Sequence, residues 1–107
     1  MKLACWVLWA AAAMPAAAAD DAAQIAQGRA LFTGGAVPAC AVCHTLKEAG
    51  SEGQVGPVLD EIKPDAARVA KALRNGLGNM PSYRATLTDS QIDALARYVA
   101  AASGGAP

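Results

Sequence analysis

The sequence predicts a small all-α protein with three to four short helices. Apolar residues recur at helical spacing within residues 21–32, 64–75 and 88–102. The residues that flank Cys40 show the same helical periodicity and no strand-like alternation. Glycine and proline are frequent between these stretches, where they interrupt regular structure. We therefore expect short helices joined by irregular loops.

The first 19 residues (1–19) have the composition of a secretory signal peptide. One positive charge precedes the apolar run of residues 3–13, and Ala17 and Ala19 are the small residues favoured just before a cleavage site. We expect cleavage after Ala19, which leaves one domain of residues 20–107 in the periplasm.

An uncleaved membrane anchor is the alternative for this segment. The apolar residues 3–19 fall slightly short of the roughly 20 that span a bilayer, and Pro15 interrupts them. The sequence therefore favours export and cleavage, with no membrane span in the mature domain.

The mature domain is small and nearly neutral. Once Lys2 has left, eight lysine and arginine residues face nine aspartate and glutamate residues. This balance gives no basic surface for nucleic acid. We expect a monomer or one subunit of a hetero-complex.

The first predicted helix covers residues 21–32, with Ile25 and Phe32 among its larger apolar residues. Gly28 lies inside this helix, where glycine costs about 1 kcal/mol relative to alanine. Its use is therefore the close approach of another helix. Residues 33–35, Thr-Gly-Gly, are expected to end the helix.

The run Cys40-Ala41-Val42-Cys43-His44 follows, and this spacing is typical of covalent haem attachment. Two thiols separated by two residues on a helical turn can each bond one haem vinyl group. His44 then lies beneath the iron as an axial ligand, with its second ring nitrogen free to donate a hydrogen bond.

This motif has three alternative uses. A closed zinc site needs four ligands, whereas the mature chain offers two cysteines and one histidine unless carboxylates complete the set. A dithiol redox site usually follows a strand in a βαβ pattern, which the sequence lacks. A structural disulfide between Cys40 and Cys43 is the third alternative.

The residues after His44 are rich in glycine and are expected to form a loop around one edge of the haem. The loop ends at Pro57, whose carbonyl can accept a hydrogen bond from the far nitrogen of His44. The alternative interpretation is that Pro57 only forms a turn.

Pro64 and Asp65 are expected to open the next helix, which Asn75 and Gly76 end. Its apolar residues fall on one face, and its cationic residues are predicted to point outward, namely Arg68, Lys71 and Arg74.

The last helix has the clearest start. Thr88 is the predicted N-cap and Gln91 stands at the capping-box position. Residues 103–107 are expected to be a frayed tail.

Met80 is the only methionine that remains after the signal peptide is removed. It lies in a loop rich in glycine and proline, where a thioether has little use as core filler. Pro81 biases the backbone of Met80 toward an extended conformation. We interpret Met80 as the second axial ligand of the iron, and a loop methionine packed on the core as the alternative.

Together these residues resemble a small bacterial monohaem class I cytochrome c. The resemblance rests on Gly28 with Phe32, Cys40 to His44, Gly56-Pro57, Met80-Pro81 with Tyr83, and the Leu87-Thr88-Asp89 start of the final helix. It implies a class I cytochrome c fold wrapped around one covalently attached haem c. It further implies that the first and last helices cross near Gly28 and Tyr98, that the Pro57 carbonyl bonds to His44, and that Met80 lies opposite His44 on the iron.

Two features depart from this family. The link from Phe32 to Cys40 is longer than expected, and Tyr83 stands where an apolar aromatic residue is common. The Tyr83 hydroxyl therefore needs a partner, for which a haem propionate is the candidate. We predict that the haem-contacting residues are Cys40, Cys43, His44, Pro57, Met80 and Tyr83, with His44 and Met80 on the metal.

The predicted function is a periplasmic one-electron carrier between a dehydrogenase donor and an acceptor such as an oxidase or another cytochrome. The alternative is a tightly bound haem subunit of a periplasmic oxidoreductase, for example a molybdenum or quinoprotein dehydrogenase. A His/Met iron has no vacant position for substrate, so the chain itself is predicted not to be an enzyme. The same saturation argues against a peroxidase or gas sensor.

Overall fold

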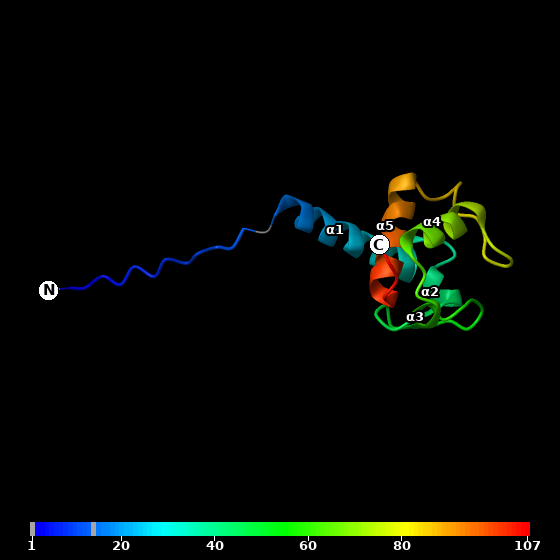
Figure 1. Cartoon of the computed structure of the whole chain (residues 1–107), viewed down its shortest axis with the longest axis horizontal. Helices are drawn as coiled ribbons and strands as arrows, with labels where there is room; N and C mark the ends of the chain where they lie inside the picture. The colour runs from blue at the N-terminus through cyan, green and yellow to red at the C-terminus, as the bar shows by residue number, and fades with distance from the viewer. Residues whose placement is uncertain (1, 14) are drawn as a thin grey trace.

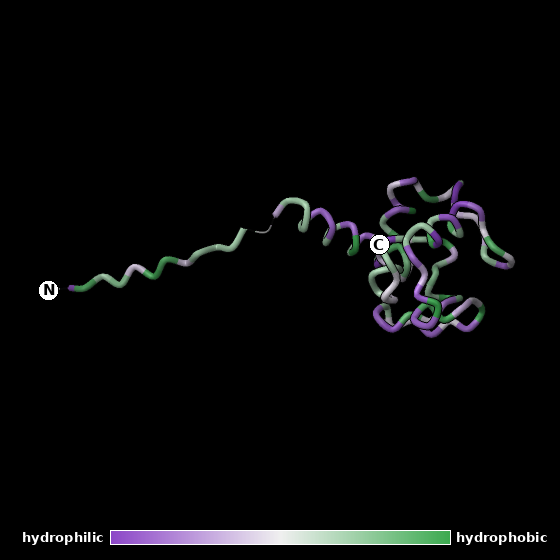
Figure 2. Tube along the Cα trace, viewed as in Figure 1, coloured by the Kyte–Doolittle hydropathy of each residue, from purple (hydrophilic) through white to green (hydrophobic). Residues whose placement is uncertain are grey.

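A computed structural model describes residues 2–13 and 15–107. The fold is all-α, as predicted, apart from one very short hairpin. Residues 2–13 run as an exposed, extended, largely hydrophobic segment that leads away from the helical domain (Figures 1 and 2). In the described part of the chain, no helix combines the length and the apolar character that a membrane crossing requires.

The described residues form five α-helices, one π-helical turn and two short strands (Figure 1). In chain order they are α1 (Ala16–Ala30), η1 (Leu31–Gly35), α2 (Cys40–Cys43), β1 (Thr45–Leu46), β2 (Ser51–Glu52), α3 (Leu59–Ile62), α4 (Ala66–Asn75) and α5 (Asp89–Ser103). The two strands pair antiparallel. The turn η1 takes up part of the long link between Phe32 and Cys40.

Helix α5 is the centre of the core, because it packs against both α1 and α4. The predicted crossing of the first and last helices is confirmed. A Cβ built on Gly28 would lie 2.5 Å from the Tyr98 Cβ and closer still to the carbonyl oxygen of Ala94. Only a residue without a side chain lets α1 approach α5 this closely.

Both predicted helix starts are capped by side chains. An Asp65 carboxylate oxygen accepts from the backbone N–H of Arg68 at 2.7 Å, which makes Asp65 the N-cap of α4. At α5, the Thr88 hydroxyl accepts from the Gln91 N–H at 3.1 Å, and the Gln91 side chain accepts from the Thr88 N–H at 2.9 Å. The predicted capping box is therefore present.

Two local expectations were wrong. Helix α1 begins at Ala16 rather than at residue 21, because the alanines on both sides of the expected cleavage site continue the same helix. The C-terminal tail is not frayed: α5 extends to Ser103, and the Ala66 N–H donates to the Ala106 carbonyl at 3.0 Å. The chain end is thereby tied to the first turn of α4.

We expect Gly28→Ala to lower the free energy of unfolding by about 1–3 kcal/mol, because the added methyl group forces α1 away from α5. Denaturant unfolding of the purified protein measures the change. Gly34→Ala is the matched control, since a Cβ at Gly34 meets nothing within 4 Å. Equal stability of the two variants would contradict a tight crossing at Gly28.

Candidate haem-binding site

Helix α2 is a single turn that brings the two cysteines of the motif together. The His44 N–H donates to the Cys40 carbonyl at 2.9 Å and closes this turn. Cys40 is buried, Cys43 is half-buried, and both are free thiols. Burial raises the pKa of the Cys40 thiol to about 11, with a smaller increase from the charge of Cys43 and a backbone hydrogen bond acting in the opposite direction. At neutral pH the Cys40 sulfur is therefore a neutral group on an apolar wall.

The imidazole of His44 is oriented by the backbone on its far side. Its Nδ1 lies 2.8 Å from the carbonyl oxygen of Pro57. A carbonyl only accepts, so Nδ1 carries the proton and donates it, and Nε2 keeps a free lone pair for a metal. This is the hydrogen bond that the family resemblance implied.

Gly56 lies directly against the same ring. A Cβ at Gly56 would stand 2.6 Å from the His44 Cε1 and 2.9 Å from Nδ1. The Gly56 N–H also donates to the Cys43 carbonyl at 2.7 Å. Backbone atoms thus enclose the imidazole on the side away from the cavity.

The loop that follows His44 is anchored by Ser51, the first residue of β2. The Ser51 hydroxyl donates to the His44 carbonyl at 2.9 Å and accepts from the Leu46 N–H at 3.1 Å. The Thr45 hydroxyl donates to the Gly53 carbonyl at 3.0 Å. The hairpin is short, yet it fixes the backbone that follows the histidine.

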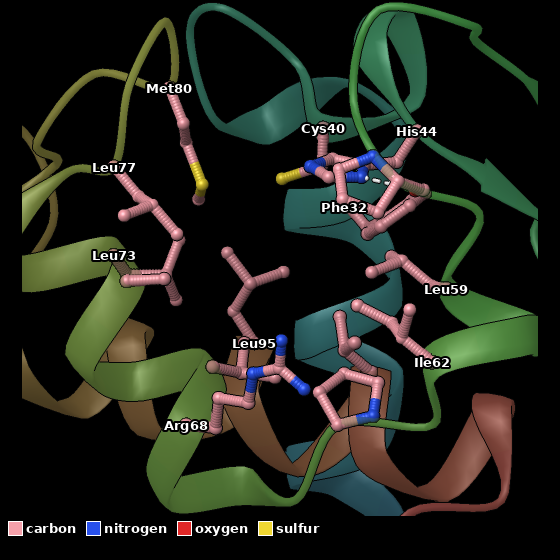
Figure 3. A pocket seen from close by; sticks show the side chains of 15 residues that line it. Phe32, Cys40, His44, Leu59, Ile62, Arg68, Leu73, Leu77, Met80 and Leu95 are labelled. Carbon is pink, nitrogen blue, oxygen red and sulfur yellow. Dashed lines mark hydrogen bonds between the residues drawn. The ribbon is translucent and has the colours of Figure 1, made fainter.

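Met80 enters the site from a tight turn between α4 and α5. The Leu77 N–H donates to the Met80 carbonyl at 3.0 Å, and the Met80 N–H donates to the Leu77 carbonyl at 2.9 Å. The Tyr83 N–H then donates to the Leu73 carbonyl at 2.7 Å and ties the loop to α4. As a result, the Met80 side chain points across the cavity toward the side on which His44 lies (Figure 3).

An apolar cavity separates His44 from Met80 (Figure 3). It holds about 620 Å³ that protein atoms do not fill, part of it open to solvent. Aliphatic and aromatic side chains form most of its wall, among them Phe32, Leu59, Ile62, Leu73, Leu77, Leu95 and Val99. An adjoining hollow on the cysteine side adds Cys43, Val55 and Tyr83. The structure therefore brings all six predicted site residues to these two connected hollows.

The Tyr83 hydroxyl has a different partner from the one we expected. It donates to the Pro38 carbonyl at 2.6 Å, so it is satisfied by the backbone of the link before α2 rather than left for a haem propionate. Burial, followed by the nearby Cys40 and Cys43, raises the pKa of Tyr83 to about 12. The phenol is therefore neutral at physiological pH, and it braces the loop of Met80 against the cysteine motif.

Sequence reasoning missed one cavity residue with a formal charge. Arg68 was predicted to point outward with the polar face of α4, and it is exposed, but its side chain also lines the cavity. The apolar periodicity of α4 also identified Leu73 as a core residue without indicating that it lines a cofactor cavity.

The site suits a haem and does not suit zinc. No group of three histidine, cysteine, aspartate or glutamate side chains comes together anywhere in residues 2–13 and 15–107. A flat apolar ring, by contrast, matches an apolar cavity with two thiols at one end and one nitrogen and one sulfur donor on its two sides. His44 and Met80 are the side chains that would hold the iron, and Cys40 and Cys43 those that would attach the ring.

Comparison with known proteins agrees with this geometry. Residues 23–99 match the family model described as cytochrome c oxidase, cbb3-type, subunit III. Among solved structures, the chain is similar to the crystal structure of the c-type cytochrome SorU from Sinorhizobium meliloti, with 48% identity and a TM-score of 0.75. The match covers 79% of this chain and 97% of that chain. No curated protein gives a match.

We expect Gly56→Ala to disturb the proximal ligand without unfolding the domain. The added methyl group would overlap the His44 ring and weaken its hydrogen bond to Pro57, which makes the imidazole a poorer electron donor. The midpoint potential of the haem-loaded protein should therefore rise relative to wild type. Potentiometric titration measures it, with Gly34→Ala as control. A wild-type potential in Gly56→Ala would show that the ring is not confined at this point.

Proposed function

The chain belongs to the c-type cytochrome family, since the family model matches residues 23–99, and on this premise we propose that it carries single electrons in the periplasm through one His/Met-ligated haem c. One observation supports the ligand set most strongly. His44 and Met80 extend from opposite walls of an apolar cavity that has Cys40 and Cys43 at one end.

The chemistry that the haem supplies is a reversible one-electron change of its iron. The chain contributes two fixed donors: Nε2 of His44, freed by the hydrogen bond to Pro57, and the thioether of Met80. The soft sulfur of Met80 favours ferrous iron. If His44 and Met80 both bound the iron, no position would remain for a substrate. This arrangement supports electron transfer and not catalysis by the chain itself.

The apolar wall of the cavity has a second role in this proposal. Side chains such as Phe32, Leu73 and Leu95 leave little polar surface beside the ring, so few water dipoles can reorient when the iron changes charge. Removal of water also raises the cost of the more highly charged ferric state. The first effect speeds electron transfer in both directions, and the second favours the reduced state.

Export and cleavage after Ala19 remain part of the proposal. The described residues before Pro15 are all exposed and pack against nothing in the domain. The folded contacts of α1 come from residues beyond the expected cleavage point, including Asp21, whose carboxylate lies 3.7 Å from Arg97 of α5. Removal of residues 1–19 would therefore leave the domain intact.

We propose as partners a periplasmic dehydrogenase as electron donor and an oxidase or another cytochrome as acceptor. Two apolar side chains beside the cysteine motif favour the alternative role as a permanent haem subunit of a molybdenum or quinoprotein dehydrogenase. They are Val37 and Val42, which are 78% and 65% exposed and do not line the haem cavity. Obligate interfaces are more apolar than transient ones, so such residues suit a lasting complex.

Intact-mass measurement of the exported protein tests attachment and cleavage together. We expect the mass of residues 20–107 plus one haem, because the chain has one Cys-x-x-Cys-His motif and one predicted cleavage site. A mass equal to the polypeptide alone, or to the polypeptide with zinc, would overturn the haem proposal. A mass that includes residues 1–19 would restore the membrane-anchor alternative.

Met80→Ala tests the distal ligand. We expect the variant to keep its covalent haem but lose the near-infrared sulfur-to-iron band, because no second methionine remains in the mature chain. Loss of the thioether should weaken the preference for ferrous iron about a hundredfold, which lowers the midpoint potential by about 120 mV. The opened position should also take up carbon monoxide.

Leu77→Ala is the matched control for this experiment. It removes a cavity side chain from the same turn but no sulfur. It should keep the band and shift the potential only slightly. An unchanged near-infrared band and midpoint potential in Met80→Ala would show that Met80 does not bind the iron. The gas-sensor and peroxidase hypotheses would then apply again.

A further inference from the structure

One formally charged side chain lines the haem cavity. Of the fifteen residues in its wall, Arg68 is the only lysine, arginine, aspartate or glutamate. Its guanidinium extends from α4 at the end of the cavity remote from Cys40, near Ile62 (Figure 3). The cavity is therefore electrostatically asymmetric, with two sulfur groups at one end and a cation at the other.

The Arg68 guanidinium is not used within the chain. Arg29, Arg74 and Arg97 each lie within 4.0 Å of a carboxylate oxygen. Across residues 2–13 and 15–107, no carboxylate lies within this distance of Arg68. The nearby Asp65 accepts instead from the backbone N–H of Arg68, where it caps the helix.

The geometry of haem c supplies a partner for this cation. The vinyl groups that form the thioethers and the two propionate carboxylates lie on opposite edges of the porphyrin. If the vinyl edge were attached to Cys40 and Cys43, the propionate edge would face the end of the cavity that contains Arg68. A guanidinium presents paired N–H donors that match a carboxylate, and it stays charged at every physiological pH.

We propose that Arg68 binds a haem propionate and that this ion pair sets part of the reduction potential. The proposal rests on the haem site described above. Tyr83, the residue we had expected to meet a propionate, is already bonded to Pro38 on the cysteine side of the site. Arg68 is thus a positioning residue: it acts on the iron through the charge of the propionate.

The sign of the effect follows from the charges. An uncompensated propionate stabilises the more positive ferric iron, whereas a propionate paired with Arg68 does so less. Removal of the guanidinium should therefore favour the oxidised protein and lower the midpoint potential. Because the Arg68 side chain is exposed, salt should screen the pair, and its effect on the midpoint potential should decrease at high ionic strength.

The test compares haem-loaded Arg68→Gln with Lys71→Gln. Both substitutions remove one positive charge from an exposed side chain of α4, but Lys71 does not line the cavity. In Arg68→Gln we expect about a tenfold change in the ferric-to-ferrous ratio at a fixed potential, equivalent to about 59 mV for one electron. Lys71→Gln should change this ratio less than twofold. The propionate bending band in the resonance Raman spectrum should shift only in Arg68→Gln.

Equal potentials and equal Raman bands in the two variants would overturn the proposal. If Arg68→Gln fails to accumulate with haem, Arg68→Lys replaces it. Lysine keeps the positive charge but cannot make the paired contact with a carboxylate. We therefore expect Arg68→Lys to shift the propionate band and to change the midpoint potential less than Arg68→Gln would. An unshifted propionate band would overturn the proposal. Wild-type protein without covalent haem would instead refute the proposed function. If only the Arg68 prediction fails, the proposed function is not contradicted.

Discussion

The close crossing of α1 and α5 at Gly28 is the contact on which the site depends. It brings Phe32, one turn further along, into an edge-to-face arrangement with Tyr98, with ring centroids 5.8 Å apart and an interplanar angle of 64°. Phe32 also forms part of the cavity wall. The Tyr98 hydroxyl donates to Glu48, which in turn accepts from Arg29 at 3.1 Å. A helix contact remote from the motif thus fixes the loop that follows the proximal histidine.

Much of the architecture could be predicted, because the relevant signals are local. The capping box of Thr88 and Gln91 depends on residues three positions apart, and the structure contains it. The use of Gly28 followed from the cost of glycine within a helix. The Cys-x-x-Cys-His motif places two thiols and one imidazole within a single turn, so its geometry hardly depends on the rest of the chain.

The features that escaped prediction depend on contacts between distant residues. The hydrogen bond from Ala66 to Ala106 joins two chain segments whose composition gives no sign of pairing. The Tyr83 hydroxyl reaches Pro38, 45 residues earlier. Helical periodicity assigned Arg68 to the outer face of α4, yet a long side chain at the edge of that face can turn back toward an adjacent cavity. The spacing of residues along a helix predicts the face from which a side chain extends, but not the position of the end of a long side chain.

The glycines around His44 show how a loop with few large apolar residues can still be rigid. A Cβ at Gly53 would lie 2.6 Å from the carbonyl carbon of Cys43 and from the His44 nitrogen, and Gly56 is equally close to the imidazole. Backbone therefore packs on backbone, and the Pro57 carbonyl orients the ring. Backbone contacts and one short side chain, that of Ser51, hold His44, so it has few alternative positions to adopt when the charge beside it changes. For a chain that only gains and loses electrons, such a preorganised ligand keeps structural rearrangement small in both directions of transfer.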